Sequence, residues 1–226
     1  MSPGTLYVVS TPIGNLKDIS FRALEILNQV DLIAAEDTRH TEILLKRHEI
    51  GKRMISYHEH NEVNRAPQLV DFLEAGDSIA LVCNAGTPTI SDPGYRVIKL
   101  AADRGIPIVP VPGPSALLAA LVMSGLPTDR FLFEGFLPRK KGRTSRLQSL
   151  ASFDGTVIIY ESPQRIVDTL NDVCTHFGNR QMVLCREITK KFETILRGTV
   201  QDVITRVEER PPKGECVLVI GKGGLS

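Results

Sequence analysis

Short apolar runs alternate with amphipathic stretches through the first half of the chain. Runs such as Leu6–Val9 and Ile79–Val82 are typical of buried strands, whereas Phe21–Val30 has apolar side chains at helical spacing. Strands that alternate with helices predict a mostly parallel sheet. The predicted strands are Leu6–Val9, Leu32–Ala35, Met54–Tyr57, Ile79–Val82 and Ile106–Val111, and the predicted helices are Phe21–Val30, Thr38–Arg47, Glu62–Glu74, Tyr95–Arg104 and Pro114–Met123.

The pattern changes after Gly125–Asp129, a stretch of turn-forming residues that we take as a domain boundary. Beyond it strands predominate, and few convincing helices remain. We predict strands at Phe131–Phe136, Thr156–Tyr160, Met182–Glu187, Phe192–Arg197 and Glu215–Ile220, and helices at Arg165–Phe177 and Val200–Glu209. The fold class is therefore α/β, with an N-terminal domain over 1–124, built on a mostly parallel sheet, and a mixed α/β domain over 125–226.

Composition narrows the class of protein. The 226 residues are 42% hydrophobic and 23% charged, as expected of a globular protein, and the net charge is only +1. Any nucleic-acid-binding surface must therefore be local. The four cysteines show no C-x-x-C spacing, so neither a zinc ribbon nor a redox dithiol is indicated, and reduced thiols favour a cytoplasmic protein. We expect no signal peptide and no membrane association, because no apolar run approaches the roughly 20 residues of a spanning helix.

Three loops rich in glycine and proline follow three of the predicted strands, at Ser10–Asn15, Cys83–Gly94 and Pro112–Ala116. Loops at the carboxyl ends of parallel strands meet at one edge of the sheet, where α/β proteins bind ligands. Gly86 would let a ligand approach the backbone, and the N–H groups of Ser115 and Ala116 would point at it. Each loop alone could be a simple turn into a helix; together they suggest one pocket. No G-x-G-x-x-G and no Walker A motif accompanies them.

Charged segments offer further candidates. Glu36–Arg39 could cap a helix, or position a substrate with Arg39 on an RNA phosphate. His58 and His60 share a face if the chain is extended, but no third ligand has recognisable spacing, so no metal is expected, and a solvated loop or an RNA contact remains. The basic run over 139–146 is either a solvated loop or a phosphate-binding patch; its candidate RNA-binding residues are Arg139, Lys140, Lys141 and Arg143.

Seven segments in this order carry a family resemblance: 10–16 (STPIGNL), 35–39 (AEDTR), 57–62 (YHEHNE), 85–94 (AGTPTISDPG), 112–116 (PGPSA), 160–163 (YESP) and 186–190 (REITK). The sequence resembles the ribosomal RNA small-subunit methyltransferase I family, a branch of the tetrapyrrole-methylase superfamily, from Leu6 to about Gly221. It departs from the usual pattern at Cys83-Asn84, where the family has Ser-Asp.

The resemblance implies S-adenosylmethionine as cofactor, in a cleft between two α/β domains, and 2′-O-methylation of a cytidine in the decoding region of small-subunit (16S) rRNA. It also implies a homodimer that acts on rRNA, with the assembled subunit as the expected substrate. By analogy with the superfamily, the cofactor-binding residues would be Pro12, Asn84, Ala85, Gly86, Thr87, Ile90, Ser115, Ala116, Tyr160, Arg186, Glu187 and Gly214.

The expected reaction is an in-line attack of a ribose hydroxyl on a methyl carbon, which a general base would assist. Asp92, Glu36 and Lys190 are the candidate catalytic residues, with the acids and histidines of 36–37 and 58–60 as further possibilities. Two alternatives stay open: a small-molecule tetrapyrrole methyltransferase on the same fold, and a non-catalytic RNA- or nucleotide-binding module.

Overall fold

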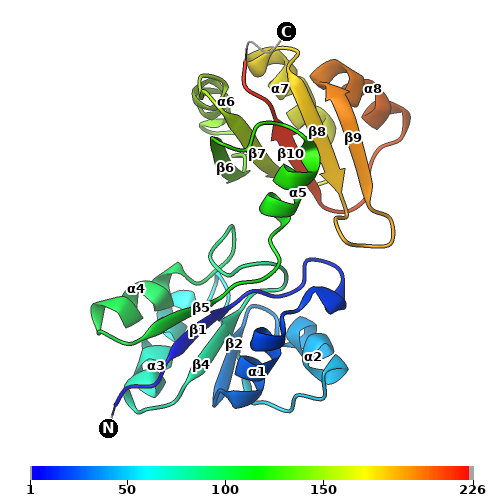
Figure 1. The fold of residues 1–226 in the computed structure, drawn as a ribbon. Coiled ribbons are helices and arrows are strands. Elements are labelled where there is room, and N and C mark those ends of the chain that lie inside the picture. The colour runs from blue at the N-terminus through cyan, green and yellow to red at the C-terminus, as the bar shows by residue number, and fades with distance from the viewer. Residues whose placement is uncertain (1, 224–226) are drawn as a thin grey trace. The chain divides into compact units, whose positions relative to one another are not determined.

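Residues 2–223 are described in a computed structural model of the chain. The chain divides between Ser115 and Ala116 into two units, each with its own sheet. Figure 1 shows both units as a ribbon and labels elements of each, β3 excepted.

The sheet of the first unit is entirely parallel, with strand order β3-β2-β4-β1-β5. The strands Leu32–Ala35 and Ile79–Val82 in its interior are buried along their whole length, because helices cover both faces, as a parallel sheet requires. The strands are β1 (Leu6–Val9), β2 (Leu32–Ala35), β3 (Met54–Ser56), β4 (Ile79–Val82) and β5 (Ile108–Val111). The helices are α1 (Phe21–Gln29), α2 (Thr38–Arg47), α3 (Glu62–Glu74) and α4 (Tyr95–Asp103), with a short 3-10 helix at Leu16–Asp18.

The helices of the first unit divide between the two faces of its sheet (Figure 1). Side chains of α1 and α2 form one apolar cluster with Val9 and Ile33, and side chains of α3 and α4 form another with Leu6 and Leu81. The chain leaves β1 through α1 toward β2, and leaves β4 through α4 toward β5, so the two connections depart in opposite directions. The carboxyl ends of β1 and β4 are therefore the switch point, where sheets of this kind bind ligands.

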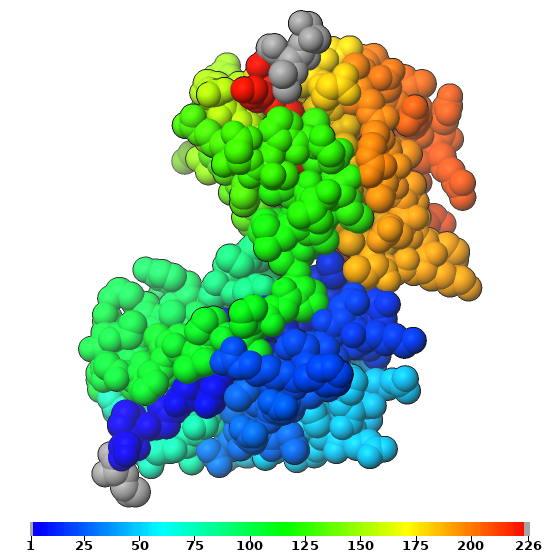
Figure 2. Space-filling model, in the orientation of Figure 1, coloured from blue at the N-terminus to red at the C-terminus, as the bar shows by residue number. Residues whose placement is uncertain are grey.

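The second unit has a mixed sheet of order β6-β7-β10-β8-β9, in which β6 and β7 are parallel and the other pairs antiparallel. Its main core lies between this sheet and α6, α7 and α8. Helix α5 contacts β10 and β8, and its segment is visible on the surface of the unit in Figure 2. The elements are α5 (Ala116–Ser124), β6 (Phe131–Phe136), α6 (Arg143–Ala151), β7 (Thr156–Glu161), α7 (Ile166–Phe177), β8 (Gln181–Arg186), β9 (Thr194–Thr199), α8 (Val200–Glu209) and β10 (Cys216–Ile220).

The predicted fold class is confirmed, and the differences have local causes. The predicted boundary at 124/125 is the end of α5, whereas the units divide at its start, because α5 packs on β10 and β8. Strand β8 ends at Arg186 since Glu187 adopts φ +52°, a left-handed conformation that does not continue a strand. Helix α6 was not predicted; it occupies part of the basic run over 139–146, for which we predicted no helix.

Candidate functional site

The loops after β1 and β4 are joined by a backbone bridge. The Thr11 N–H donates to the Gly86 carbonyl at 2.8 Å, and the Gly86 N–H donates to the Thr11 carbonyl at 3.0 Å. The buried Thr11 hydroxyl also donates to the Cys83 carbonyl at 3.1 Å. The two loops therefore hold each other in place at the switch point of the sheet.

The loop after β5 joins the same assembly through hydroxyl groups. The Ser10 Oγ and Thr87 Oγ1 atoms lie 2.9 Å apart, and the Thr87 hydroxyl donates to the Pro114 carbonyl at 3.5 Å. Gly113 passes so close that a Cβ on it would lie 3.0 Å from the Ser10 Cβ. The three glycine- and proline-rich loops of the sequence thus form one continuous edge, as their positions after neighbouring strands predict.

The backbone of the β4 loop is strained. Thr89 and Ser91 have φ of +76° and +65°, conformations that non-glycine residues rarely adopt. Gly94 has φ +143°, and a Cβ there would lie 2.7 Å from the Thr89 Cγ2. Each such residue costs about 1–3 kcal/mol and persists only where its surroundings hold it, which is commonly at a functional site.

Glu36 anchors the β4 loop from the end of β2. Its Oε2 accepts a hydrogen bond from the Asn84 N–H at 3.0 Å. Asp37, next in the chain, caps α2 by accepting from the Arg39 N–H at 2.9 Å and also pairs with the Arg39 guanidinium at 2.8 Å. Hydrogen bonds from Arg39 hold the pKa of the Asp37 carboxyl well below its usual range. The helix-capping interpretation of this segment is confirmed, and the Arg39 side chain itself is 88% exposed.

Cys83 and Asn84 stand at the base of the same loop. Burial, and then the negative charges of Asp92 and Glu36, raise the pKa of the Cys83 thiol, so it stays protonated and unreactive at neutral pH. The half-buried Asp92 therefore lies near this thiol. The Asn84 Oδ1 atom is buried and has no hydrogen-bond partner among residues 2–223. Buried polar atoms in proteins nearly always have such a partner, so this oxygen calls for an explanation.

A hollow of about 380 Å³, part of it open to solvent, lies beside the β1 and β4 loops. The first two turns of α2 form its other side. Its lining comprises Thr11, Pro12, Leu16, His40, Thr41, Ile43, Leu44, Cys83 and Asn84. Two of the predicted cofactor-binding residues, Pro12 and Asn84, thus border a space that sequence reasoning did not anticipate.

In the second unit, Tyr160 stands at the end of β7. Its hydroxyl accepts a hydrogen bond from the Leu117 N–H at 3.0 Å, and its ring makes edge contacts with Phe133 and Phe136, at centroid distances of 4.8 and 5.7 Å. Leu117 belongs to the first turn of α5, directly after Ser115 and Ala116. Tyr160 therefore fixes the start of the helix that follows the β5 loop.

Glu187, Lys190 and Glu215 form a charged cluster after β8. The Lys190 ammonium lies 2.9 Å from the Glu187 Oε1 and 3.1 Å from the Glu215 Oε2. Burial acts to lower the pKa of Lys190, but the bonds to both carboxylates outweigh it, and the pKa is raised. Lys190 is thus protonated at neutral pH. Gly214 is required here, since its φ is +87° and a Cβ would lie 2.2 Å from the Glu187 Oε1.

Arg186, another predicted cofactor-binding residue of this unit, is the last residue of β8. Its guanidinium donates to the carbonyls of Lys213, at 3.2 Å, and Phe192. The Arg186 Nε is buried and has no partner in the described part of the chain. Arg186 thus holds the β8–β9 and 210–215 loops together and keeps one donor unused.

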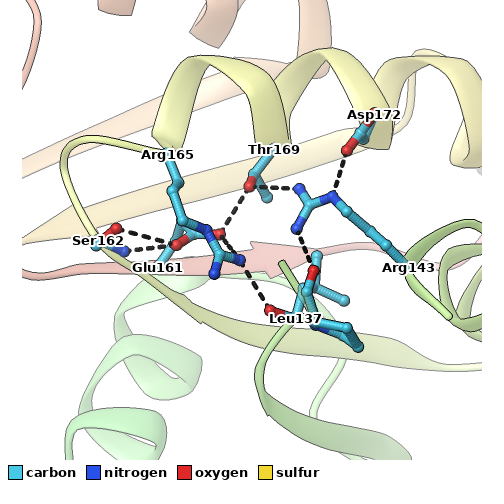
Figure 3. A network of polar contacts seen from close by, with 8 residues as sticks. Leu137, Arg143, Glu161, Ser162, Arg165, Thr169 and Asp172 are labelled. Atoms are coloured by element: carbon cyan, nitrogen blue, oxygen red, sulfur yellow. Dashed lines mark hydrogen bonds and ion pairs between the residues drawn. The ribbon is translucent and has the colours of Figure 1, made fainter. Parts of the chain in front are cut away.

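Arg143 belongs to a polar network inside the second unit (Figure 3). It donates to Asp172 at 2.7 Å, to the Thr169 hydroxyl at 2.8 Å and to the Pro138 carbonyl at 3.1 Å. The fully buried Glu161 accepts from Thr169 at 2.7 Å and from Arg165 at 2.9 Å. This network ties the basic segment to α7. Arg143 therefore has a structural role.

Part of the remaining basic segment is free to meet a partner, whereas Arg146 pairs with Glu134 at 2.6 Å. Arg139, Lys140 and Lys141 are exposed. Sequence reasoning included Ser10 in the first candidate loop but gave it no role of its own, and it did not find Thr169, which nothing local marks.

The two histidines of 57–62 differ. The His58 N–H donates to the Asn61 Oδ1 at 2.9 Å and its ring contacts the Asn61 amide, whereas His60 is exposed. Between residues 2 and 223, no three His, Cys, Asp or Glu side chains are grouped so that they could hold a metal ion. No helix within those residues is long and apolar enough to cross a membrane.

Comparisons with known proteins identify the fold and the family. The model of the tetrapyrrole (corrin/porphyrin) methylases matches residues 5–204, and the chain belongs to this family. A diphthine synthase structure is similar over 99% of this chain and 92% of its own, with a TM-score of 0.75 and 18% identity. A uroporphyrin-III C-methyltransferase from Thermus thermophilus, complexed with S-adenosyl homocysteine, gives 0.67 and 17%, over 96% and 97% of the two chains.

Curated relatives are more similar in sequence. The ribosomal RNA small subunit methyltransferase I of Halalkalibacterium halodurans is 49% identical over 97% of this chain and 77% of its own length. The protein of that name from Synechocystis sp. is 51% identical over 96% and 78%. Identity at this level across both units makes this chain a close relative of these proteins within the family.

Proposed function

We propose that the chain uses S-adenosylmethionine to methylate small-subunit rRNA, at the 2′-hydroxyl of a cytidine in the decoding region. The observation that carries the proposal is the edge formed by the loops after β1, β4 and β5, which hydrogen bonds of Ser10, Thr11 and Thr87 hold together. The names of the relatives that are about half identical, and the S-adenosyl homocysteine in a structure of the same fold, support the substrate and the cofactor.

The residues of the first unit fit such a cofactor. Gly86 has φ +86°, a conformation that favours glycine, but it is buried against Ile13 and both its backbone groups pair with Thr11, so the expected ligand approach to its backbone is not available; Ala85 and Ile90 beside it are exposed. The loops offer backbone donors and acceptors, which can hold the polar groups of the cofactor. We propose that Pro12, Asn84, Thr87 and Ser115 also hold the cofactor, and that the second unit contributes Ala116, Tyr160, Arg186, Glu187 and Gly214.

S-adenosylmethionine supplies, when bound, a methyl carbon on a positively charged sulfur. The chain has to orient the ribose hydroxyl and accept its proton, and good orientation alone can contribute about 7–11 kcal/mol. Asp92 is our candidate for the general base, which adds roughly 10²–10⁴-fold. Glu36 serves by holding the Asn84 N–H. Lys190, whose pKa is raised, supplies positive charge and is no proton acceptor.

For the RNA we propose contacts from Arg39, His60 and the exposed segment Arg139–Lys141, because exposed basic side chains can bind phosphates. His58 is a further proposed RNA contact; Asn61 accepts from its backbone N–H and contacts its Nε2. A cytoplasmic homodimer completes the proposal; the four free cysteines agree with a reducing compartment.

The test is transfer of a labelled methyl group to assembled small ribosomal subunits, to naked 16S rRNA and to a tetrapyrrole acceptor, with nucleoside analysis of the RNA. We expect 2′-O-methylcytidine from intact subunits, and a strong loss with Asp92→Asn. Label in another nucleoside would refute the cytidine assignment, and label in the tetrapyrrole alone would move the protein to small-molecule methylation. The matched control for Asp92→Asn is Asp18→Asn, the same substitution on the short 3-10 helix.

A further inference from the structure

Apart from Pro12 and Asn84, the residues that line the hollow between the β1 loop, the β4 loop and α2 are not among the proposed cofactor-binding residues. We propose that the hollow receives the base of the target nucleotide. This inference rests on the proposed function, the methylation of rRNA. The reaction needs the ribose of one nucleotide at the cofactor, so its base must lie within a few ångströms of the cofactor loops. The hollow shares Pro12 and Asn84 with those loops and meets this requirement.

The walls of the hollow suit a flat ring. Pro12, Leu16, Ile43 and Leu44 supply apolar surface from three separate elements. Leu16 is 37% exposed and Ile43 is 61% exposed. Large apolar side chains at the rim of a concave site are typical of ligand pockets, and bases extruded from RNA are held between such surfaces.

Polar groups at the base of the hollow match the edge of a pyrimidine. Asn84 lines the hollow, and its side-chain Oδ1 is buried without a hydrogen-bond partner in the described part of the chain. An unsatisfied acceptor costs about 1–3 kcal/mol, which a ligand donor can recover. Cytosine offers an exocyclic amino donor beside acceptors, and the Asn84 amide, which carries both a donor and an acceptor, can pair with that edge after rotating about its side-chain bonds.

The position of the hollow distinguishes the target base from the adenine of the cofactor. Its lining comes from the β1 loop, the β4 loop and α2, and the β5 loop contributes none of it, although the β5 loop belongs to the joined cofactor edge. Its α2 side begins beside Arg39, whose guanidinium is almost fully exposed, and the exposed His40 lines it. A cation beside the entrance fits a nucleotide that is still attached to a phosphate chain.

The first test fills the hollow from its rim with Ile43→Trp. We expect the KM for small subunits to rise at least about tenfold, which is the scale of losing one stacked base, while the Kd for S-adenosyl homocysteine changes less than twofold. Val63→Trp is the matched control, because Val63 is a 62% exposed β-branched residue on α3, which packs on the opposite face of the sheet. An equal loss of cofactor affinity would assign the hollow to adenine, and no change in either constant would leave it without a role; both overturn the proposal.

The second test does not depend on methyl transfer. Methyl NMR of the protein saturated with S-adenosyl homocysteine is recorded as cytidine 5′-monophosphate is added at millimolar concentration. We expect shifts at the methyl groups of Ile43 and Leu44, none at Val63, and loss of the Leu44 shifts in Ile43→Trp. Absence of shifts overturns the base-binding proposal even if rRNA is methylated. Shifts without any methylation of subunits would instead refute the proposed function.

Discussion

Thr169 links two charged groups in the core of the second unit, and replacing it with valine tests that link. Its side chain is fully buried, donates to the Glu161 Oε2 at 2.7 Å and accepts from the Arg143 Nη2 at 2.8 Å (Figure 3). Valine keeps the branched shape and removes the hydroxyl. Thr169→Val therefore deprives a buried carboxylate and a mostly buried guanidinium of one partner each.

The expected loss follows from these two contacts. A hydrogen bond to a charged group contributes about 1.5–3 kcal/mol, and a buried group left unsatisfied costs a similar amount. Because Glu161 keeps Arg165 and the Ser162 N–H, and Arg143 keeps Asp172, we expect the lower end, about 3 kcal/mol for the pair.

Buried thiols allow the two units to be measured separately. Cys185 and Cys216 are buried in the second unit and Cys83 in the first, so labelling under native conditions, read by mass spectrometry of peptides, reports the opening of each. About 3 kcal/mol corresponds to roughly 100-fold faster labelling of Cys185 and Cys216. The rate at Cys83 should not change.

The matched control is Thr175→Val, the same substitution on the exposed side of the same helix, where the hydroxyl donates to the Asn171 carbonyl. It should change labelling by less than about threefold, since exposed substitutions stay within about 0.5 kcal/mol. If Thr169→Val accelerates the second unit no more than Thr175→Val does, the network contributes nothing to stability and the reasoning fails.

Three further outcomes are expected. Thr87→Tyr should abolish cofactor binding in calorimetry while the circular dichroism spectrum is retained, because a ring cannot fit between Ser10 and Pro114; unchanged affinity refutes the site. Glutamate at all three positions of Arg139–Lys141 should weaken RNA binding and flatten its dependence on salt, with cofactor affinity as the control, and an unchanged slope would make this segment an ordinary surface. Burial raises the pKa of Tyr57 from 10.0 to about 12, so the stability contributed by its neutral phenol is complete below pH 10 and is lost as pH rises toward 12. The free energy of unfolding of Tyr57→Phe in urea should therefore fall less over this pH range than that of the unchanged protein. An equal fall in both proteins excludes Tyr57 as the cause.

The parts that the sequence predicts well are those where a buried face leaves a periodic pattern. Glu62–Glu74 and Val200–Glu209 are helices with those bounds, because apolar residues recur on one side. Helix α6 escapes prediction because Leu147 and Leu150 are its only fully buried side chains, and Gly142 precedes it without a capping side chain. Its presence depends on tertiary packing rather than on local signals.

The candidate site also has parts that the sequence predicts and parts that it does not. The three loops could be located because turn residues follow apolar strands. The hollow beside α2 could not, since its walls come from segments far apart in the chain and only the sheet order brings them together. The role of Arg143 was also hidden, because its partner Asp172 lies on another helix.

The strand order has a consequence for synthesis on the ribosome. β1 is made first but lies between β4 and β5, so it finds its second neighbour only after Val111 has emerged. In the other sheet, β10 is the central strand and the last to be made, and β7 and β8 have no common partner until Cys216–Ile220 appears. Leu6–Val9 therefore stays without its second neighbour while residues up to Val111 are made, and β7 and β8 stay apart until β10 is made. During both intervals apolar strands are exposed to aggregation, and we expect chaperones that bind extended apolar segments to protect them.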